Sequence, residues 1–166
     1  MKLTMGIWRR IEKLELEIKE SQKYLGEQCD KLNKVDNDIF FEVLSKKLET
    51  TIAKNNVEIL KRKKELVKEA FDTDENAEEL FIFLKQAIFT LLDKKAKEMP
   101  DTKGSNTNYD KMNAYQQVIH LYSVLHREYR WTRQTIDNED IEYIYDLTIV
   151  QALGHEEKEA TIDSVL

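Results

Sequence analysis

The first 71 residues alternate between apolar and polar positions with the period of two long helices. Apolar residues recur at gaps of three, four or seven, a spacing that keeps them on one stripe of a helix. The first run comprises Ile11, Leu14, Ile18, Leu25, Leu32 and Val35, and the second comprises Phe41, Leu44, Leu48, Ile52, Ile59 and Leu66. Because a short polar stretch separates the two runs, the pattern predicts an antiparallel helical hairpin that resembles a coiled coil.

Polar residues predict the ends and the register of this hairpin. Thr4 is suited to cap the first helix, which we expect to end near Val35, and Asp36 or Asp38 is suited to cap the second. Within the first run, Ser21 and Gln28 take places where the pattern calls for apolar residues. A fold at Asn37 would bring three ion pairs together across the hairpin: Glu12 with Lys61, Glu20 with Lys54, and Glu27 with Lys47.

A third helix is expected after the hairpin. Asp72 is followed three residues later by Glu75, which is the spacing of a capping box. The segment from Leu80 to Leu92 is apolar nearly all the way round. Such a helix is either central to a core or covered by a partner, and we expect it to be a core helix that ends near Lys97.

The rest of the chain predicts a loop, two more helices and a tail. The only Pro lies in a loop expected at 98–109. We expect helices over 110–133 and from Asp137, as N-cap, to 153, followed by an acidic tail over 155–166. The prediction is therefore an all-α protein with two parts, a long antiparallel helical hairpin over 1–71 and a C-terminal three-helix bundle over 72–166.

Charge is distributed unevenly between these two parts. Residues 1–71 hold 16 Lys and Arg against 13 Asp and Glu, whereas residues 72–166 hold 10 against 19. The formal net charge of −6 argues against a general polyanion-binding protein. The simplest interpretation is that the two parts attract each other, and the alternative is that the acidic part faces a basic partner.

Two groups of basic residues are candidate contact sites. Lysines recur every seven residues in the second helix and would form one stripe: Lys47, Lys54, Lys61 and Lys68. Such a stripe could follow a nucleic-acid backbone or an acidic protein groove, whereas the simpler interpretation pairs it with glutamates of the first helix. A second group follows at spacings of three, with an aromatic residue between its members: Arg127, Arg130, Trp131 and Arg133. Guanidinium and indole groups can contact phosphates and bases, but these arginines could equally pair with the acidic residues that follow them.

The sequence contains no signature of a metal site or of an enzyme. His120 and His126 are six residues apart, about 240° around a helix, so they do not share one face. Residues 72–83 match the first three ligand positions of a calcium-binding loop but lack its Gly and its final Glu. There is no phosphate-binding glycine loop, no nucleophile elbow and no CxxC pair. We therefore predict no catalytic, metal-binding or cofactor-binding residues.

The sequence also bears on where the protein is found. Cys29 is the single cysteine, so no internal disulfide is expected. The first residues lack the apolar core of a signal peptide. The longest apolar run, Leu80–Leu84, is far shorter than the roughly 20 residues of a membrane-spanning helix. These features predict a soluble cytoplasmic protein that does not contact a membrane.

No motif in the chain identifies a known family. The first hypothesis is a non-enzymatic protein-interaction module, an accessory or inhibitory subunit that docks on a larger complex or self-associates. The Lys-, Asn-, Ile- and Glu-rich composition would suit an AT-rich microbe or a phage. The alternative is a helical nucleic-acid-binding protein that uses the two basic groups. A third hypothesis is an enzyme whose carboxylate site is dispersed along the sequence.

Overall fold

A computed structural model of the chain describes residues 1–73, 75–98 and 111–151. These residues form helices and no strand, and the one β feature among them is an isolated bridge between Thr4 and Asp140. The predicted all-α class is confirmed. The helices are α1 (Met5–Leu32), α2 (Asp38–Phe71), α3 (Ala77–Glu98), α4 (Ala114–Tyr129), α5 (Arg133–Asn138) and a last helix over 141–151.

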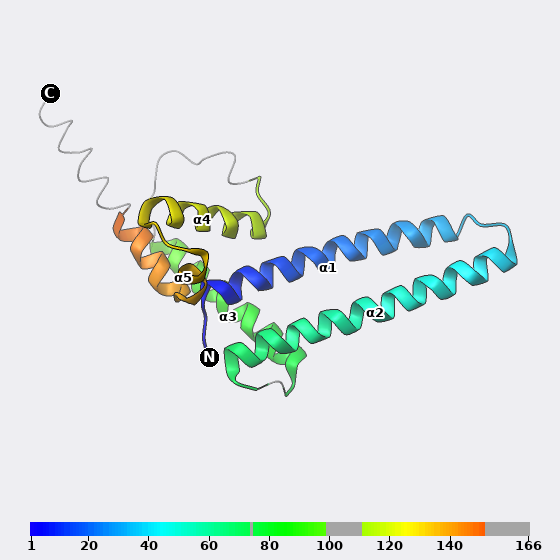
Figure 1. Cartoon of the computed structure of the whole chain (residues 1–166), viewed down its shortest axis with the longest axis horizontal. Coiled ribbons are helices and arrows are strands. Elements are labelled where there is room, and N and C mark those ends of the chain that lie inside the picture. The colour runs from blue at the N-terminus through cyan, green and yellow to red at the C-terminus, as the bar shows by residue number, and fades with distance from the viewer. Residues whose placement is uncertain (74, 99–110, 152–166) are drawn as a thin grey trace, which may run out of the picture.

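The two longest helices, α1 and α2, run antiparallel and extend away from the rest of the molecule as an arm (Figure 1). The Thr4 hydroxyl caps α1 by accepting a hydrogen bond from the Ile7 amide at 3.4 Å, as predicted. The cap of α2 is Asn37, whose side-chain oxygen accepts from the Phe40 amide at 3.0 Å. The prediction of Asp36 or Asp38 at this position was wrong because Asn37 holds the extended backbone of an N-cap and Asp38 is already helical.

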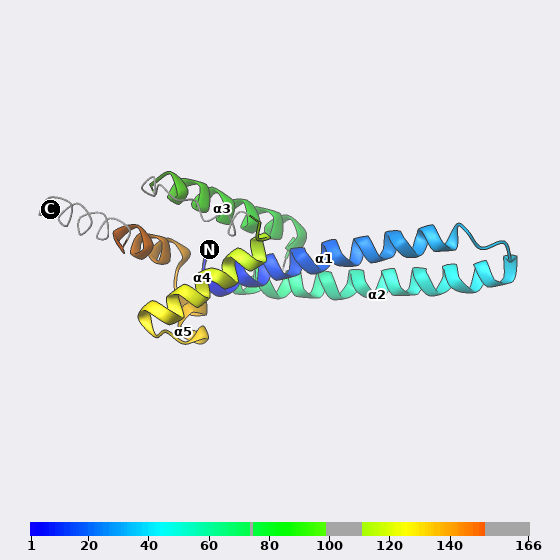
Figure 2. The ribbon, with the colours of Figure 1, turned by 90° about the horizontal axis from the view of Figure 1, so that it is seen from above.

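The register of the hairpin differs from the predicted one. Among the described residues, the contacts across the arm join Arg10 with Glu69, Arg62 with Glu17, and Asn55 with Ser21. None of the three predicted ion pairs is formed between those residues. The Ser21–Asn55 contact places the last residue of α1, Leu32, level with residue 44 of α2. Residues 38–43 of α2 therefore extend past the end of α1, and residues 33–37 span this offset (Figure 2).

All the helices contribute to one buried cluster at the base of the arm. The cluster contains Met5, Ile7, Trp8, Ile11 and Leu14 of α1 together with residues of every later helix. Helix α3 packs against α2, while α4 and α5 pack against α1. The three-helix bundle predicted for 72–166 is therefore not a separate core, because the later helices use the base of the hairpin as their packing surface.

The N-terminal segment is bonded to two distant parts of the chain, the end of α2 and the start of the last helix. The Lys2 amide donates to the Ala70 carbonyl at 2.9 Å, and the Met5 amide donates to the Glu139 carbonyl at 2.9 Å. The Ile141 amide in turn donates to the Leu3 carbonyl at 3.0 Å. These backbone bonds hold the N-terminal segment between the end of α2 and the start of the last helix.

Several helix ends differ from the predicted ones. Asp72 is the C-cap of α2, with a left-handed φ of 62°, and not the N-cap of α3, which begins at Ala77. Helix α3 ends at Glu98, close to the predicted Lys97. Beyond it, the predicted loop lies outside the described residues except for Glu98 itself, and the predicted acidic tail over 155–166 lies wholly outside them.

The segment predicted as one long helix over 110–133 contains the shorter helix α4 and the start of α5. Asn113 caps α4 in a capping box with Gln116, and the helix ends where Arg130 adopts a left-handed φ of 58°. A new short helix, α5, then begins after its cap, Thr132. Asp137 lies within α5, so its predicted role as an N-cap was wrong, and the next helix starts four residues later, at 141.

Candidate interaction surface

The distal arm, which we define as residues 15–65, contains no buried residue. Leu14 is the last buried residue of α1, and Leu66 is the first of α2. Half-buried apolar side chains form an inner seam between the two helices, comprising Ile18, Leu25, Leu32, Leu44, Leu48, Ile52 and Ile59. Because these side chains keep part of their surface in water, the distal arm gains much less stability from burial than the base does.

The inner seam is also interrupted by polar residues and a hollow. The Asn55 side-chain amide donates to the Ser21 hydroxyl at 3.0 Å, at one of the two places where the heptad pattern lacks an apolar residue. The other, Gln28, lines a pocket of about 280 Å³ together with Leu32, Leu44 and Leu48. The two helices alone therefore do not close the seam near the tip.

The tip of the arm exposes large apolar side chains. Ile39 is 78% exposed and Phe40 is 58% exposed, and Phe41 and Val43 are also exposed. All four lie in the part of α2 that extends past the end of α1, so the hairpin offers them no partner helix (Figure 2). Contiguous exposed apolar residues of this kind are typical of protein-interaction sites.

The predicted lysine stripe lies along the arm on α2. Lys47, Lys54, Lys61 and Lys68 are all exposed, and none of them takes part in an ion pair among the described residues. The pairing with α1 glutamates that would have explained the stripe is therefore not formed. Exposed apolar residues accompany the lysines, among them Val57, which is 69% exposed, and Leu60.

The second basic group does not form the predicted helical row. Arg127 is the only one of its three arginines within α4, because Arg130 caps that helix and Arg133 begins α5. Arg127 pairs with the adjacent Glu128, and the Arg133 Nε lies 3.8 Å from a carboxylate oxygen of Asp137. The left-handed turn at Arg130 thus separates side chains that a continuous helix would have aligned.

Trp131 belongs to an aromatic stack at this turn. Its ring centroid lies 5.3 Å from that of Tyr129 and 6.5 Å from that of Tyr143, with the latter pair nearly parallel. The His126 Nδ1 donates a hydrogen bond to the Trp131 carbonyl at 2.8 Å. These contacts assign Trp131 a structural role in the connection between α4 and α5.

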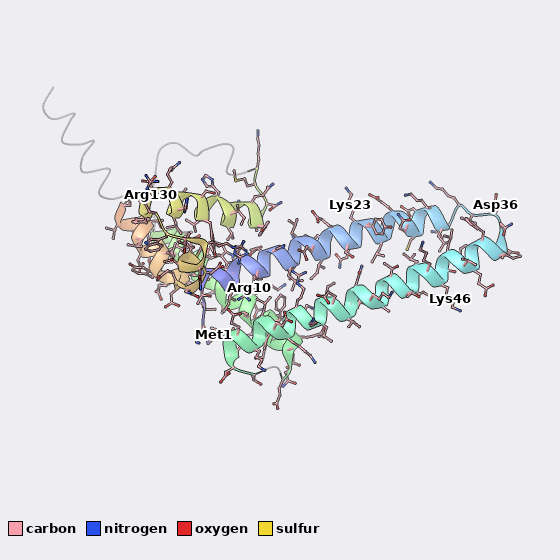
Figure 3. All side chains as sticks on the ribbon, in the orientation of Figure 1. Met1, Arg10, Lys23, Asp36, Lys46 and Arg130 are labelled. Carbon is pink, nitrogen blue, oxygen red and sulfur yellow. The ribbon has the colours of Figure 1, made fainter. Side chains whose placement is uncertain are left out.

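The two basic groups do not combine into one surface. In Figure 1, α4 and α5 lie at the base of the arm, whereas most of the lysine stripe lies farther out along α2. Figure 3 places Arg130 at the end of the molecule opposite to Lys46 and Asp36. A ligand bound along the distal arm would therefore meet Lys47, Lys54 and Lys61, but the three arginines lie outside that segment.

A partly buried ion pair links the base of α1 to α5. The Arg9 guanidinium donates to both carboxylate oxygens of Asp137 at 3.1 Å, and the Tyr122 hydroxyl donates to the same carboxylate at 2.6 Å. Burial alone would raise the Asp137 pKa, but these hydrogen bonds outweigh it and hold the pKa below its usual value. Burial and the bond to Asp137 raise the pKa of Tyr122, which keeps the phenol protonated.

A second buried cation joins α3 to the last helix. The Lys95 ammonium, with 6% of its side chain exposed, contacts Asp146 at 2.6 Å, Glu98 at 3.2 Å and Glu142 at 3.5 Å. The hydrogen bond to Asp146 is the largest cause that raises the pKa of Lys95. Sequence reasoning did not identify this residue, because its carboxylate partners on the last helix lie about 50 positions later in the chain.

A pocket at the base is lined by both polar and apolar side chains. A pocket of about 520 Å³ between α1 and α3 is lined by apolar Trp8 and Ile88, and by Glu12 and the ion pair of Glu15 with Lys85. Burial raises the pKa of Glu12. Within the part of the chain that the structure describes, no three His, Cys, Asp or Glu residues are grouped as a metal site requires.

Helix α3 also presents apolar side chains to solvent. Its inner face buries Phe81, Leu84 and Ile88, whereas Ile82, Phe83 and Phe89 on other faces are exposed. The sequence showed apolar residues on nearly all sides of this helix. In the structure, one side of α3 is part of the core and apolar residues on its other sides are exposed. Helix α3 therefore supplies further exposed apolar side chains at the base of the arm.

Comparisons with known proteins give no assignment: the chain matches no protein-family model, no curated protein and no solved structure. Among the described residues, no helix has the length and apolar character needed to cross a membrane. The candidate surface therefore has to be interpreted from its own geometry.

Proposed function

We propose that this protein is a non-enzymatic protein-interaction module whose distal arm is covered by another protein chain. The observation that carries the proposal is the lack of any buried residue between Leu14 and Leu66, combined with large exposed apolar side chains at the tip. A monomer gains little from such an arm, whereas a partner would bury its apolar rows. Accessory or inhibitory subunits of larger assemblies, cytoplasmic and coiled-coil-like, fit this description.

The proposal is tested by affinity purification of tagged full-length protein from its host cell, followed by mass spectrometry. The comparison is with a variant that carries Ile39→Asp, Val43→Asp and Val57→Asp, all of them exposed positions. Because none of these side chains is part of the buried cluster, the variant should keep its helical circular dichroism spectrum. A matched control places Asp at Val150, an exposed apolar position of the last helix that lies off the distal arm.

We expect the wild-type chain and the Val150→Asp control to recover the same protein, either a second copy with a different tag or another chain. The arm variant should recover it at a level reduced about tenfold or more, because each charged side chain opposes burial of the apolar row. Equal recovery by all three proteins would show that the arm is not the contact surface.

The second candidate function is nucleic-acid binding by the lysine stripe. The observation in its favour is that the four lysines are exposed and take part in none of the described ion pairs. Binding would then weaken steeply with salt, since each phosphate contact releases a counterion. Replacement of Lys54 and Lys61 by Glu should abolish binding and Arg130→Glu should not, and a lack of binding at low salt would remove this alternative.

A further inference from the structure

A second heptad pattern follows the side of α2 that faces away from α1. Eight positions on α2 are separated alternately by four and three residues, and every one of them is exposed: Ile39, Val43, Lys46, Thr50, Ala53, Val57, Leu60 and Lys64. We call this row the outer seam. At 3.6 residues per turn, the row lies roughly opposite the inner-seam residues Leu48 and Ile52. Figure 1 shows no other helix against this side of α2 along the distal half of the arm.

The residues of the outer seam have the side-chain types of a two-stranded coiled coil. In heptad notation, Val43, Thr50 and Val57 take position a, and these are β-branched residues, which favour pairing of two parallel helices. Ile39, Ala53 and Leu60 take position d. The two remaining positions are lysines, Lys46 at d and Lys64 at a. They lower the stability of such a helix pair but restrict its register.

The charges beside the outer seam show which partner it suits. The predicted lysine stripe, Lys47, Lys54, Lys61 and Lys68, occupies position e throughout, and Glu42 and Glu49 occupy position g. In a parallel in-register pair, position g of one helix faces position e of the next heptad on the other helix. Glu42 then meets Lys47 and Glu49 meets Lys54 of a second copy, in both directions.

An antiparallel pair of the same helices would be disfavoured. That arrangement brings e positions against e positions, so the lysine stripes of the two copies would face each other without compensation. We infer that the outer seam binds the outer seam of a second copy of this chain in parallel, over residues 39–60, with both arm tips at the same end. This inference rests on the proposed function, because it names the chain that covers the arm.

The paired region should end before the base of the arm. Toward the base, the g positions are Asn56 and Lys63, which offer no negative charge to the lysines of a partner. Lys63 is also engaged within its own chain, where it contacts Glu78 at 3.8 Å and lies 5.5 Å from the ring centroid of Phe81. Residues 39–60 form about three heptads over roughly 32 Å. Beyond them, the bases of the two chains would diverge.

Disulfide trapping of full-length protein tests the parallel arrangement. In a Cys29→Ser background, Ile39→Cys and Ala53→Cys each place a thiol at a d position, and both should give covalent dimers under mild oxidation. Parallel d positions bring the two copies within the separation that a disulfide spans. The matched control is Glu58→Cys, an exposed position of the same helix off the outer seam, which should give little dimer.

Sedimentation equilibrium of the full chain, at concentrations up to about 1 mM, tests the charge pattern. Glu49→Lys and Lys54→Glu should each weaken self-association about tenfold, and an equimolar mixture of the two variants should restore it, because the opposite charges then meet. Glu58→Lys, the same exchange off the seam, should leave the association unchanged.

Three results would overturn the inference. The first is a chain that remains monomeric at the highest concentration. The second is antiparallel pairing, in which Ile39→Cys protein forms a mixed disulfide with Leu60→Cys protein but no homodimer, and the third is disulfide trapping of the Glu58→Cys control as efficient as that of the seam variants. None of them overturns the proposed function by itself. If the arm still recovers a different protein from the host cell, the protein-interaction module remains and only its partner changes.

Discussion

The Arg9 guanidinium meets the Asp137 carboxylate through two parallel hydrogen bonds of 3.1 Å, although 128 residues separate the two in the chain. This pair joins the first helix to α5 and lies beside the buried Tyr122 ring. Together with the apolar cluster, it fixes α5 on the base of the arm. The stability of the base should therefore depend on it.

Replacement of Arg9 by Met should lower the free energy of unfolding by about 2–3 kcal/mol, because the Asp137 carboxylate would lose two charge-assisted hydrogen bonds. Urea denaturation followed by circular dichroism measures this change. As a control, Arg127→Met removes the exposed pair with Glu128 and should change stability by less than about 0.5 kcal/mol. Equal effects of the two substitutions would contradict the assigned role of Arg9.

The same pair predicts how stability depends on pH. The Asp137 pKa is lowered in the folded protein, so the charged carboxylate stabilises the fold above the unfolded value of about 3.9. This stabilisation is lost as the pH falls through the folded pKa. Asp137→Asn should therefore be less stable than the wild type near pH 7, and the gap should narrow below about pH 4. Thermal unfolding of both proteins across pH 3–7 measures the gap, and a gap that widens in acid would refute this prediction.

Two glycines of α1 should respond to alanine in opposite ways. A Cβ on Gly6 would lie 2.7 Å from the Asp137 carbonyl oxygen, so Gly6→Ala should destabilise the protein by about 1–3 kcal/mol. A Cβ on Gly26 meets nothing within 4 Å, so Gly26→Ala should stabilise α1 by up to about 1 kcal/mol through helix propensity. Paired denaturation curves give both signs, and destabilisation by Gly26→Ala would contradict the open environment of the distal arm.

The polar contact within the inner seam should lower the stability of the arm. Joint replacement of Ser21 and Asn55 by Leu should stabilise the protein by about 1 kcal/mol, because it completes the apolar row between α1 and α2. Each single replacement should gain less, since it leaves one polar side chain opposite Leu. A double-mutant cycle on the melting temperature measures the coupling. A double variant that is less stable than the wild type would indicate that the inner seam is packed differently.

Local sequence signals were sufficient to predict the long helices. The three-four spacing of apolar residues identified α1 and α2, and Thr4 was identified as a cap from its own side chain and its place before the first turn. The hairpin register could not be predicted, because it depends on how far α2 extends past α1, and the sequence of the turn does not reveal that offset. The exposed tip follows from this offset, although the run Ile39-Phe40-Phe41 was visible in the sequence.

Contacts between residues that are distant in the sequence could not be predicted, because they leave no local sequence signal. Asp is a residue type that often caps helices, so the sequence indicated a cap at Asp137. Only the contact with Arg9 in the folded structure shows that Asp137 is an ion-pair partner within α5. The left-handed φ of Arg130 ends α4 within the segment 110–133, over which the sequence predicted a single helix. The lysine stripe was found from its spacing, but the apolar row beside it became meaningful only once α1 was placed on the opposite side of α2.

Position-resolved photo-crosslinking in the host cell tests most directly whether another chain covers the arm. A benzophenone amino acid in place of Phe40 or Val57 reports on the arm, and the same group in place of the exposed Tyr143 reports on the base. We predict that both arm positions form adducts with a protein chain, either a second copy or a different partner, and that the base position forms few. Adducts at the base alone, or none from the arm, would contradict the central claim that the exposed apolar rows of the arm form an interface.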